Sequence, residues 1–91
     1  MKFVFINKKT VASMDDLYKR FAEGFQFPEY FGANLDALYD CLTEDSSDRV
    51  VFISDISDLE VTLGARLNRV RKLLADASAE SSSLRVIEIP D

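Results

Sequence analysis

Three short apolar runs mark the chain. They are KFVFIN at 2–7, RVVFIS at 49–54 and LRVIEI at 84–89, and each is rich in β-branched or aromatic residues. Such runs predict β-strands. In the first two runs the apolar residues are continuous rather than alternating, which predicts strands buried on both faces of a sheet.

Apolar residues recur at helical spacing between the first two runs. Leu17, Phe21 and Phe25 lie four residues apart and predict a first helix. Ser13 is suited to cap its start through its hydroxyl, and two acids follow in the first turn, where the helix dipole favours them. Gly24 can weaken or end this helix, and Pro28 must end it because proline lacks a backbone N–H.

A second helix is predicted from Asn34, a good N-cap residue, to about Thr43. An apolar stripe runs along it, formed by Leu35, Leu38 and Leu42 with Ala37 and Cys41 beside it. Asp36 and Asp40 are four residues apart and therefore share a different face of the helix.

Two more helices are predicted between the second and third strands. Ser57 and Glu60 form a capping-box pattern at the start of a short helix, and Gly64 is a fitting stop. A longer helix follows, marked by Leu67, Val70, Leu73, Leu74 and Ala77. The order is then β-α-α-β-α-α-β. We therefore expect an α/β fold in which a three-stranded parallel sheet packs with about four helices through right-handed crossovers.

Length and composition fit one small domain. With 91 residues, 47% of them apolar, we expect a single domain over residues 1–91 with one modest core. No apolar run approaches the roughly 20 residues of a membrane span, so no membrane partner is expected. The N-terminal segment lacks the features of a secretory signal, and the single cysteine, Cys41, cannot form an internal disulfide. These features predict a cytoplasmic protein.

Charge is distributed unevenly along the chain. The net charge is −5, and residues 29–60 hold nine of the 16 acids but one of the 11 bases, Arg49. Because phosphate binding needs clustered Lys and Arg, nucleic acid is not expected as a partner. The acid-rich segment instead favours a basic protein partner. We interpret four bases on the last predicted helix as a solvated face: Arg66, Arg69, Arg71 and Lys72.

The chain offers little for catalysis. It has no histidine, and its three isolated glycines cannot form a nucleotide-binding loop. Cys41 has no base to activate it, so we interpret it as a small buried hydrophobic residue. Asp36 and Asp40 could act as acid and base or bind a hard cation, although such cations need more oxygen ligands. We expect no catalytic residue, cofactor or metal, and interpret the pair as a solvated face or as part of a binding surface.

Aromatic residues surround this acidic pair. Phe27 and Phe31 are expected to plug the core. Tyr30 and Tyr39 combine an apolar ring with a polar tip, a property typical of binding hot spots. Carboxylates and aromatic rings together suit a partner rich in arginine and lysine, because carboxylates accept paired hydrogen bonds from guanidinium and rings stack on its flat side.

Residues 28–43, PEYFGANLDALYDCLT, resemble the signature of the barstar family, intracellular inhibitors of the bacterial ribonuclease barnase. The similarity extends more weakly along the whole chain. It implies that the chain plugs the active site of a basic ribonuclease in a one-to-one complex. Asp40 would be the main anchor in place of a substrate phosphate, and Asp36 would support it. The family also uses an acid on the last helix, where this chain has Asp76, one methylene shorter than the usual glutamate.

The partner-binding surface implied by this resemblance and the loop chemistry contains nine residues: Tyr30, Gly32, Asn34, Asp36, Tyr39, Asp40, Thr43, Glu44 and Asp76. Within it, Gly32 and Asn34 are expected to let the loop before the helix turn tightly.

The chain also departs from the best-known family member. Tyr39 stands where that member has tryptophan, and Glu44-Asp45-Ser46 stand where it has Gly-Trp-Val. The loop after the helix is thus more acidic and less apolar, a kind of change that alters specificity. The target could be a different ribonuclease, such as a toxin from competing bacteria, with this chain as its immunity protein. Two alternatives stay open: the same fold binding a non-nuclease protein, and a carboxylate- or Mg-dependent hydrolase, which the absence of histidine disfavours.

Overall fold

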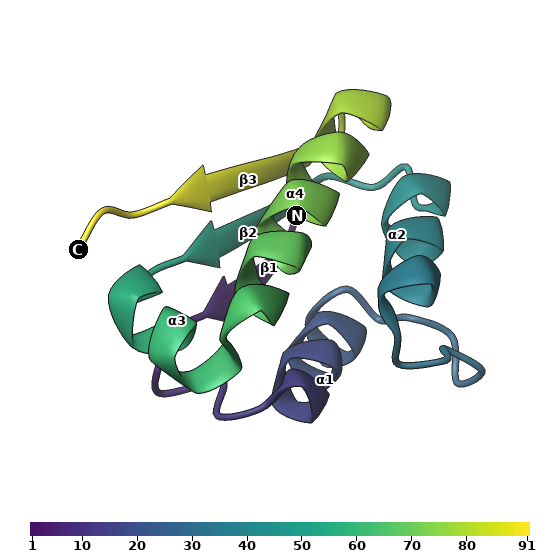
Figure 1. The fold of residues 1–91 in the computed structure, drawn as a ribbon. Coiled ribbons are helices and arrows are strands. Elements are labelled where there is room, and N and C mark those ends of the chain that lie inside the picture. Colours follow the sequence, from purple (N-terminus) through teal and green to yellow (C-terminus); the bar gives the residue numbers. More distant parts are fainter.

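A computed structural model describes all 91 residues of the protein. The elements follow in the order β1 (Lys2–Ile6), α1 (Met14–Gly24), α2 (Leu35–Glu44), β2 (Arg49–Ile53), α3 (Ile56–Leu63), α4 (Ala65–Glu80) and β3 (Leu84–Glu88) (Figure 1). The predicted α/β fold with a parallel sheet and four helices is confirmed. None of these helices is both long and apolar enough to cross a membrane.

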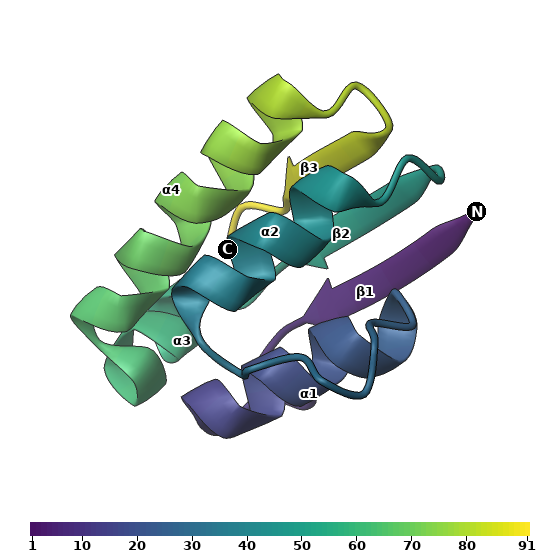
Figure 2. The same ribbon diagram turned by 90° about the vertical axis from the view of Figure 1, so that its right-hand side faces the viewer.

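The sheet has the strand order β1-β2-β3, and all its strands are parallel. Val4 on β1 lies opposite Val51 on β2, which in turn lies opposite Val86 on β3. Because both crossovers step across the sheet in the same direction, a common handedness places all the helices over one face. Figure 2 shows α1, α2 and α4 together on that side.

The prediction that the first strand is buried on both faces is wrong. Phe3 and Phe5 remain 46% and 53% exposed, whereas Val4 and Ile6 are buried beneath the helices. The rings of Phe5 and Phe52 stack at 5.2 Å on the open face and shield one another in place of a second helical layer. Only the central strand β2 approaches two-sided burial, since Val50 and Val51 are both buried.

Local capping signals set the start of α1 as predicted. The Ser13 hydroxyl accepts a hydrogen bond from the Asp16 amide at 3.1 Å. The helix then continues to Gly24, which lies against β1 so closely that an added Cβ would come within 2.5 Å of Val4 Cγ2 and 2.9 Å of the Phe3 carbonyl oxygen. Glycine at this position lets α1 pack onto the edge of the sheet.

The predicted capping box at the start of α3 does not form. The helix begins earlier, directly after Asp55, whose backbone is left-handed with φ 54° and whose side chain makes no cap bond. The Asp91 carboxylate takes the capping role and accepts hydrogen bonds from the amides of Ile56 and Ser57 at 2.9 Å and from the Ser57 hydroxyl. Gly64 ends the helix, as predicted.

The close approach of α1 to β1 gives a matched test. Gly24→Ala should lower the free energy of unfolding by about 1–3 kcal/mol, because the new methyl group overlaps the β1 backbone. Gly32→Ala should change it by less than about 0.5 kcal/mol, since the nearest atom is a movable Asn34 side-chain nitrogen at 3.2 Å. Urea unfolding of both variants measures the difference, and equal stabilities would contradict the packing described.

Candidate protein-binding site

Helix α2 presents the residues that the sequence singled out. Asn34 caps it, with its side-chain oxygen accepting from the Ala37 amide at 2.8 Å. Leu38 and Leu42 are buried in the core, whereas Asp36 and Asp40 are exposed. The two aspartates therefore stand on the outer face of the helix, as their spacing predicted.

Helix α4 packs beside α2 and adds further acids to the same face. Asp76 lies next to Tyr39 and lines a shallow hollow with it between the two helices. Glu80, which the sequence analysis did not select, also acts on Tyr39. Its signal in the sequence was a four-residue spacing from Asp76, which places both acids on one side of α4.

The environment of Tyr39 reports this concentration of negative charge. Partial burial of the ring raises the pKa of the Tyr39 phenol, and the charges of Glu80, Asp76 and Asp40 raise it further. A tyrosine phenol is protonated at neutral pH, so the Tyr39 hydroxyl can donate a hydrogen bond.

The loop between α1 and α2 is held by aromatic contacts. Phe27 and Phe31 pack edge to face at 5.0 Å, and both lie against the core, which confirms the prediction for these two rings. Tyr30 points outward and is 84% exposed. The loop thus has a fixed inner side and offers a free aromatic ring to a partner.

The tight turn of this loop does not depend on Gly32. The left-handed residues of the loop are Gln26, with φ 56°, and Ala33, with φ 43°, whereas Gly32 has no positive φ. Asn34 contributes as expected, since its amide nitrogen donates to the Gly32 carbonyl at 3.1 Å. The prediction for Asn34 is therefore confirmed, and that for the backbone freedom of Gly32 is wrong.

Part of the negative charge at the end of α2 is paired within the protein. The Thr43 hydroxyl donates to the Tyr39 carbonyl at 2.9 Å, and Glu44 is exposed. Asp45 turns inward, where its carboxylate accepts from the amide and hydroxyl of Ser47 at 2.9 and 2.7 Å and pairs with Lys2 at 3.7 Å. The loop therefore presents less negative charge to a partner than its composition predicts.

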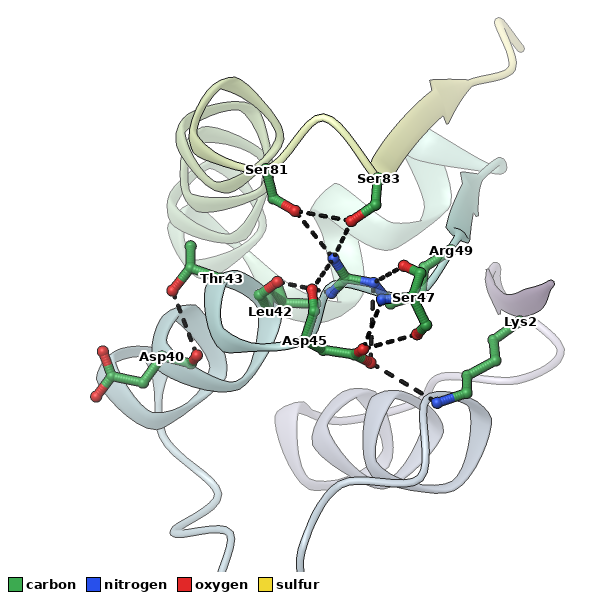
Figure 3. A network of polar contacts seen from close by, with 9 residues as sticks. All are labelled: Lys2, Asp40, Leu42, Thr43, Asp45, Ser47, Arg49, Ser81 and Ser83. Atoms are coloured by element: carbon green, nitrogen blue, oxygen red, sulfur yellow. Dashed lines mark hydrogen bonds and ion pairs between the residues drawn. The ribbon is translucent and has the colours of Figure 1, made fainter.

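Arg49, the lone base of the acid-rich segment, is completely buried. All three guanidinium nitrogens donate hydrogen bonds, to the carbonyls of Ser47, Leu42 and Asp45 at 2.6–2.8 Å and to the hydroxyls of Ser81 and Ser83 at 3.1 and 3.2 Å (Figure 3). One side chain thereby joins the end of α2, the start of β2 and the turn before β3.

Arg49 provides the positive charge that the C-terminal end of α2 otherwise lacks. The helix has no base in its last turn, although a helix C-terminus carries partial negative charge and Glu44 and Asp45 stand there. The Arg49 guanidinium, from the start of β2, supplies this positive charge and donates to carbonyls that the helix leaves unpaired. Burial alone would raise the pKa of the Asp45 carboxyl, but the hydrogen bonds from Ser47 and the charges of Arg49 and Lys2 lower it.

The only thiol of the chain, Cys41, lies close to Asp40 and Glu44. Cys41 is half-buried rather than fully buried, and burial together with Glu44 and Asp40 raises the pKa of its thiol. Because ionisation to the thiolate is disfavoured, this thiol is a poor nucleophile. No group of three or more His, Cys, Asp or Glu side chains is placed to hold a metal ion.

The match to a known protein family covers most of the chain. The model of the family described as Barstar (barnase inhibitor) matches residues 1–87. The chain belongs to the barstar family. A relative in Bacillus subtilis (strain 168), named "Putative ribonuclease inhibitor YrdF", is 37% identical over 43 residues. That match covers 47% of this chain and 47% of the relative, so it spans about half the length of each.

Arg49 offers a direct test of how this barstar-family protein holds its acidic helix. Arg49→Met should lower the free energy of unfolding by about 3 kcal/mol or more, because the buried Leu42 carbonyl and the partly buried Ser47 and Asp45 carbonyls lose their donors. Arg49→Lys keeps the charge without the planar set of donors and should give an intermediate loss. Urea unfolding is the measurement, with exposed Arg85→Met as control. Wild-type stability of Arg49→Met would contradict the anchoring role.

The titration of Tyr39 tests the arrangement of the acids. In a Tyr18→Phe/Tyr30→Phe background, ultraviolet absorbance should show Tyr39 titrating above its ordinary pKa of 10.0. Asp76→Asn with Glu80→Gln should lower the pKa but leave it raised, because burial remains. Since the folded state holds this proton more tightly, stability should fall as the pH rises from about 10 through the pKa of the folded state. The control Asp15→Asn/Glu60→Gln should leave the Tyr39 pKa unchanged. An unchanged Tyr39 pKa in Asp76→Asn/Glu80→Gln as well would show that these two acids do not act on Tyr39.

Proposed function

We propose that the protein is a one-to-one inhibitor of a basic ribonuclease and that it occludes the active site with α2 and the loop before it. Asp40 is the main anchor and takes the place of a substrate phosphate. Asp36, Asp76 and Tyr39 support it, while the loop contributes Tyr30, Gly32 and Asn34 and the end of α2 contributes Thr43 and Glu44. Membership of the barstar family supports ribonuclease inhibition as the general activity.

The observation that carries this proposal is a set of acids that the protein leaves without internal partners. Asp36, Asp40 and Asp76 take part in none of the ion pairs of the folded chain. They stand around the partly buried ring of Tyr39, so negative charge and apolar surface occur together. A ribonuclease cleft binds phosphates with arginine and lysine, and the same groups can bind carboxylates in paired hydrogen bonds.

The proposed face draws on three adjoining segments of the fold. A standard interface takes about 800 Å² from each partner. The outer side of α2, the aromatic loop and the adjoining side of α4 are contiguous in the fold, so they can form one such surface. Because the loop is fixed through Phe27 and Phe31, little ordering is required when a partner binds.

We also propose that the protein acts in the cytoplasm as an immunity protein against a bacterial ribonuclease toxin. An inhibitor of this kind protects a cell where its RNA is located. A lone half-buried cysteine is compatible with a reducing compartment.

Substitution of the anchor tests the proposed function. The wild-type protein, tagged, is used to capture partners from an extract of its source organism, and each partner is assayed for ribonuclease activity. Asp40→Asn should weaken inhibition of the captured enzyme by about 10²–10⁴-fold, since removing one member of a desolvated charge pair costs about 3–5 kcal/mol. Its fold, checked by circular dichroism, should be unchanged because Asp40 is exposed.

The matched control is Glu60→Gln, which removes one exposed acid on α3 and should inhibit like the wild type. Equal inhibition by folded Asp40→Asn would contradict the proposal. Capture of a non-nuclease partner, with no ribonuclease inhibited, would show that the scaffold serves another interaction.

A further inference from the structure

Three of the four bases of α4 form a second charged region on the face that carries the acids. The fourth, Arg71, turns toward the sheet and binds Glu88 through two hydrogen bonds of 2.6 and 3.0 Å. The three on the shared face, Arg66, Arg69 and Lys72, are exposed and make no ion pair. The four bases are thus not one solvated face, because α4 divides them between two sides.

The three unpaired bases lie beside the start of α2. Arg66 and Arg69 border a hollow of about 630 Å³ that also reaches Asn34 and Asp36. Arg69 continues into the neighbouring hollow, which it shares with Lys72 and with Leu35, Asp36, Tyr39, Leu73 and Asp76. Along the α4 side of the groove the charge therefore changes from the bases Arg66, Arg69 and Lys72 to the acid Asp76, while Asp36 of α2 borders both hollows.

This order of charges does not stabilise α4. The helix has no acid in its first turn and no base in its last, where its dipole would favour them. Arg66 and Arg69 instead stand in the N-terminal half, and Asp76 and Glu80 stand near the C-terminus. Arg66 in the first turn and Glu80 in the last oppose the dipole, whereas Arg69, Lys72 and Asp76 lie outside these turns. Arg66 has a role within the fold, since its Nε donates to the Leu63 carbonyl at the end of α3 at 3.1 Å. Arg69 and Lys72 make no ion pair, and their exposed charges point to a role outside the helix.

We infer that Arg69 and Lys72, assisted by Arg66, bind carboxylates on the rim of the target ribonuclease, whose surface must change from acidic to basic along α4 from its N-terminus to its C-terminus. The inference rests on the proposed function and adds a specificity element to it. A nuclease that is basic along the whole rim would meet three like charges on this face. This repulsion lowers the affinity for wrong partners, and attraction to rim carboxylates fixes the orientation of the right one.

The test uses the ribonuclease that the wild-type protein captures and inhibits. Arg69→Gln/Lys72→Gln should weaken binding by about tenfold, mainly through a slower association rate at low ionic strength, and the difference should shrink at high salt. Arg69→Glu/Lys72→Glu should weaken it further. Lys9→Gln/Arg85→Gln gives the same change in net charge on exposed residues away from this face and should bind within about twofold of wild type. Urea unfolding should show the Arg69→Gln/Lys72→Gln variant as stable as the wild type within about 0.5 kcal/mol, because both side chains are exposed and make no ion pair.

The outcomes distinguish failure of the α4 inference from failure of the proposed inhibitor function. Unchanged or tighter binding by both α4 variants, with Asp40→Asn still defective, would overturn the inference that the α4 bases bind rim carboxylates. It would leave the inhibitor function standing. Wild-type inhibition by Asp40→Asn, or capture of no ribonuclease, would overturn both.

Discussion

The buried guanidinium of Arg49 is the interaction on which the acidic face depends. A helix that ends in Glu44 and Asp45 repels its own terminus, and its last carbonyls need donors. Arg49 supplies both charge and donors from the first residue of the central strand. Since the same group also binds Ser81 and Ser83 before β3, the position of α2 is tied to the sheet. Negative charge can then gather on the outer side of α2 while the opposing positive charge stays buried.

The charges at the ends of α4 do not stabilise the helix. Arg66 in the first turn and Glu80 in the last both oppose the helix dipole. The helix is held instead by its apolar side, where Leu67 and Leu74 are buried in the core. Packing therefore offsets the unfavourable charges. A preformed face of this kind loses little conformational freedom on binding, which favours tight association.

Local signals in the sequence were sufficient for the elements, and long-range packing decided the remainder. Helix starts at Ser13 and Asn34 followed from side-chain caps within three residues. The burial of Arg49 could not be predicted, because the hydroxyls it binds lie up to 34 residues away. The open face of β1 was missed for a related reason: a continuous apolar run does not reveal that Phe5 stacks on Phe52 instead of a helix. In the site, the acids of α2 followed from their spacing, whereas the role of Glu80 depended on how α4 packs.

Native-state amide hydrogen exchange of the free protein tests the central claim that Arg49 makes α2 part of the cooperative core. The Leu42 amide at the end of α2 is compared with the Val51 amide in the central strand. If Arg49 fastens the helix, both amides should exchange only through global unfolding and give the same free energy of opening. A markedly lower opening free energy at Leu42 would show that α2 detaches locally, and it would contradict a preformed acidic face.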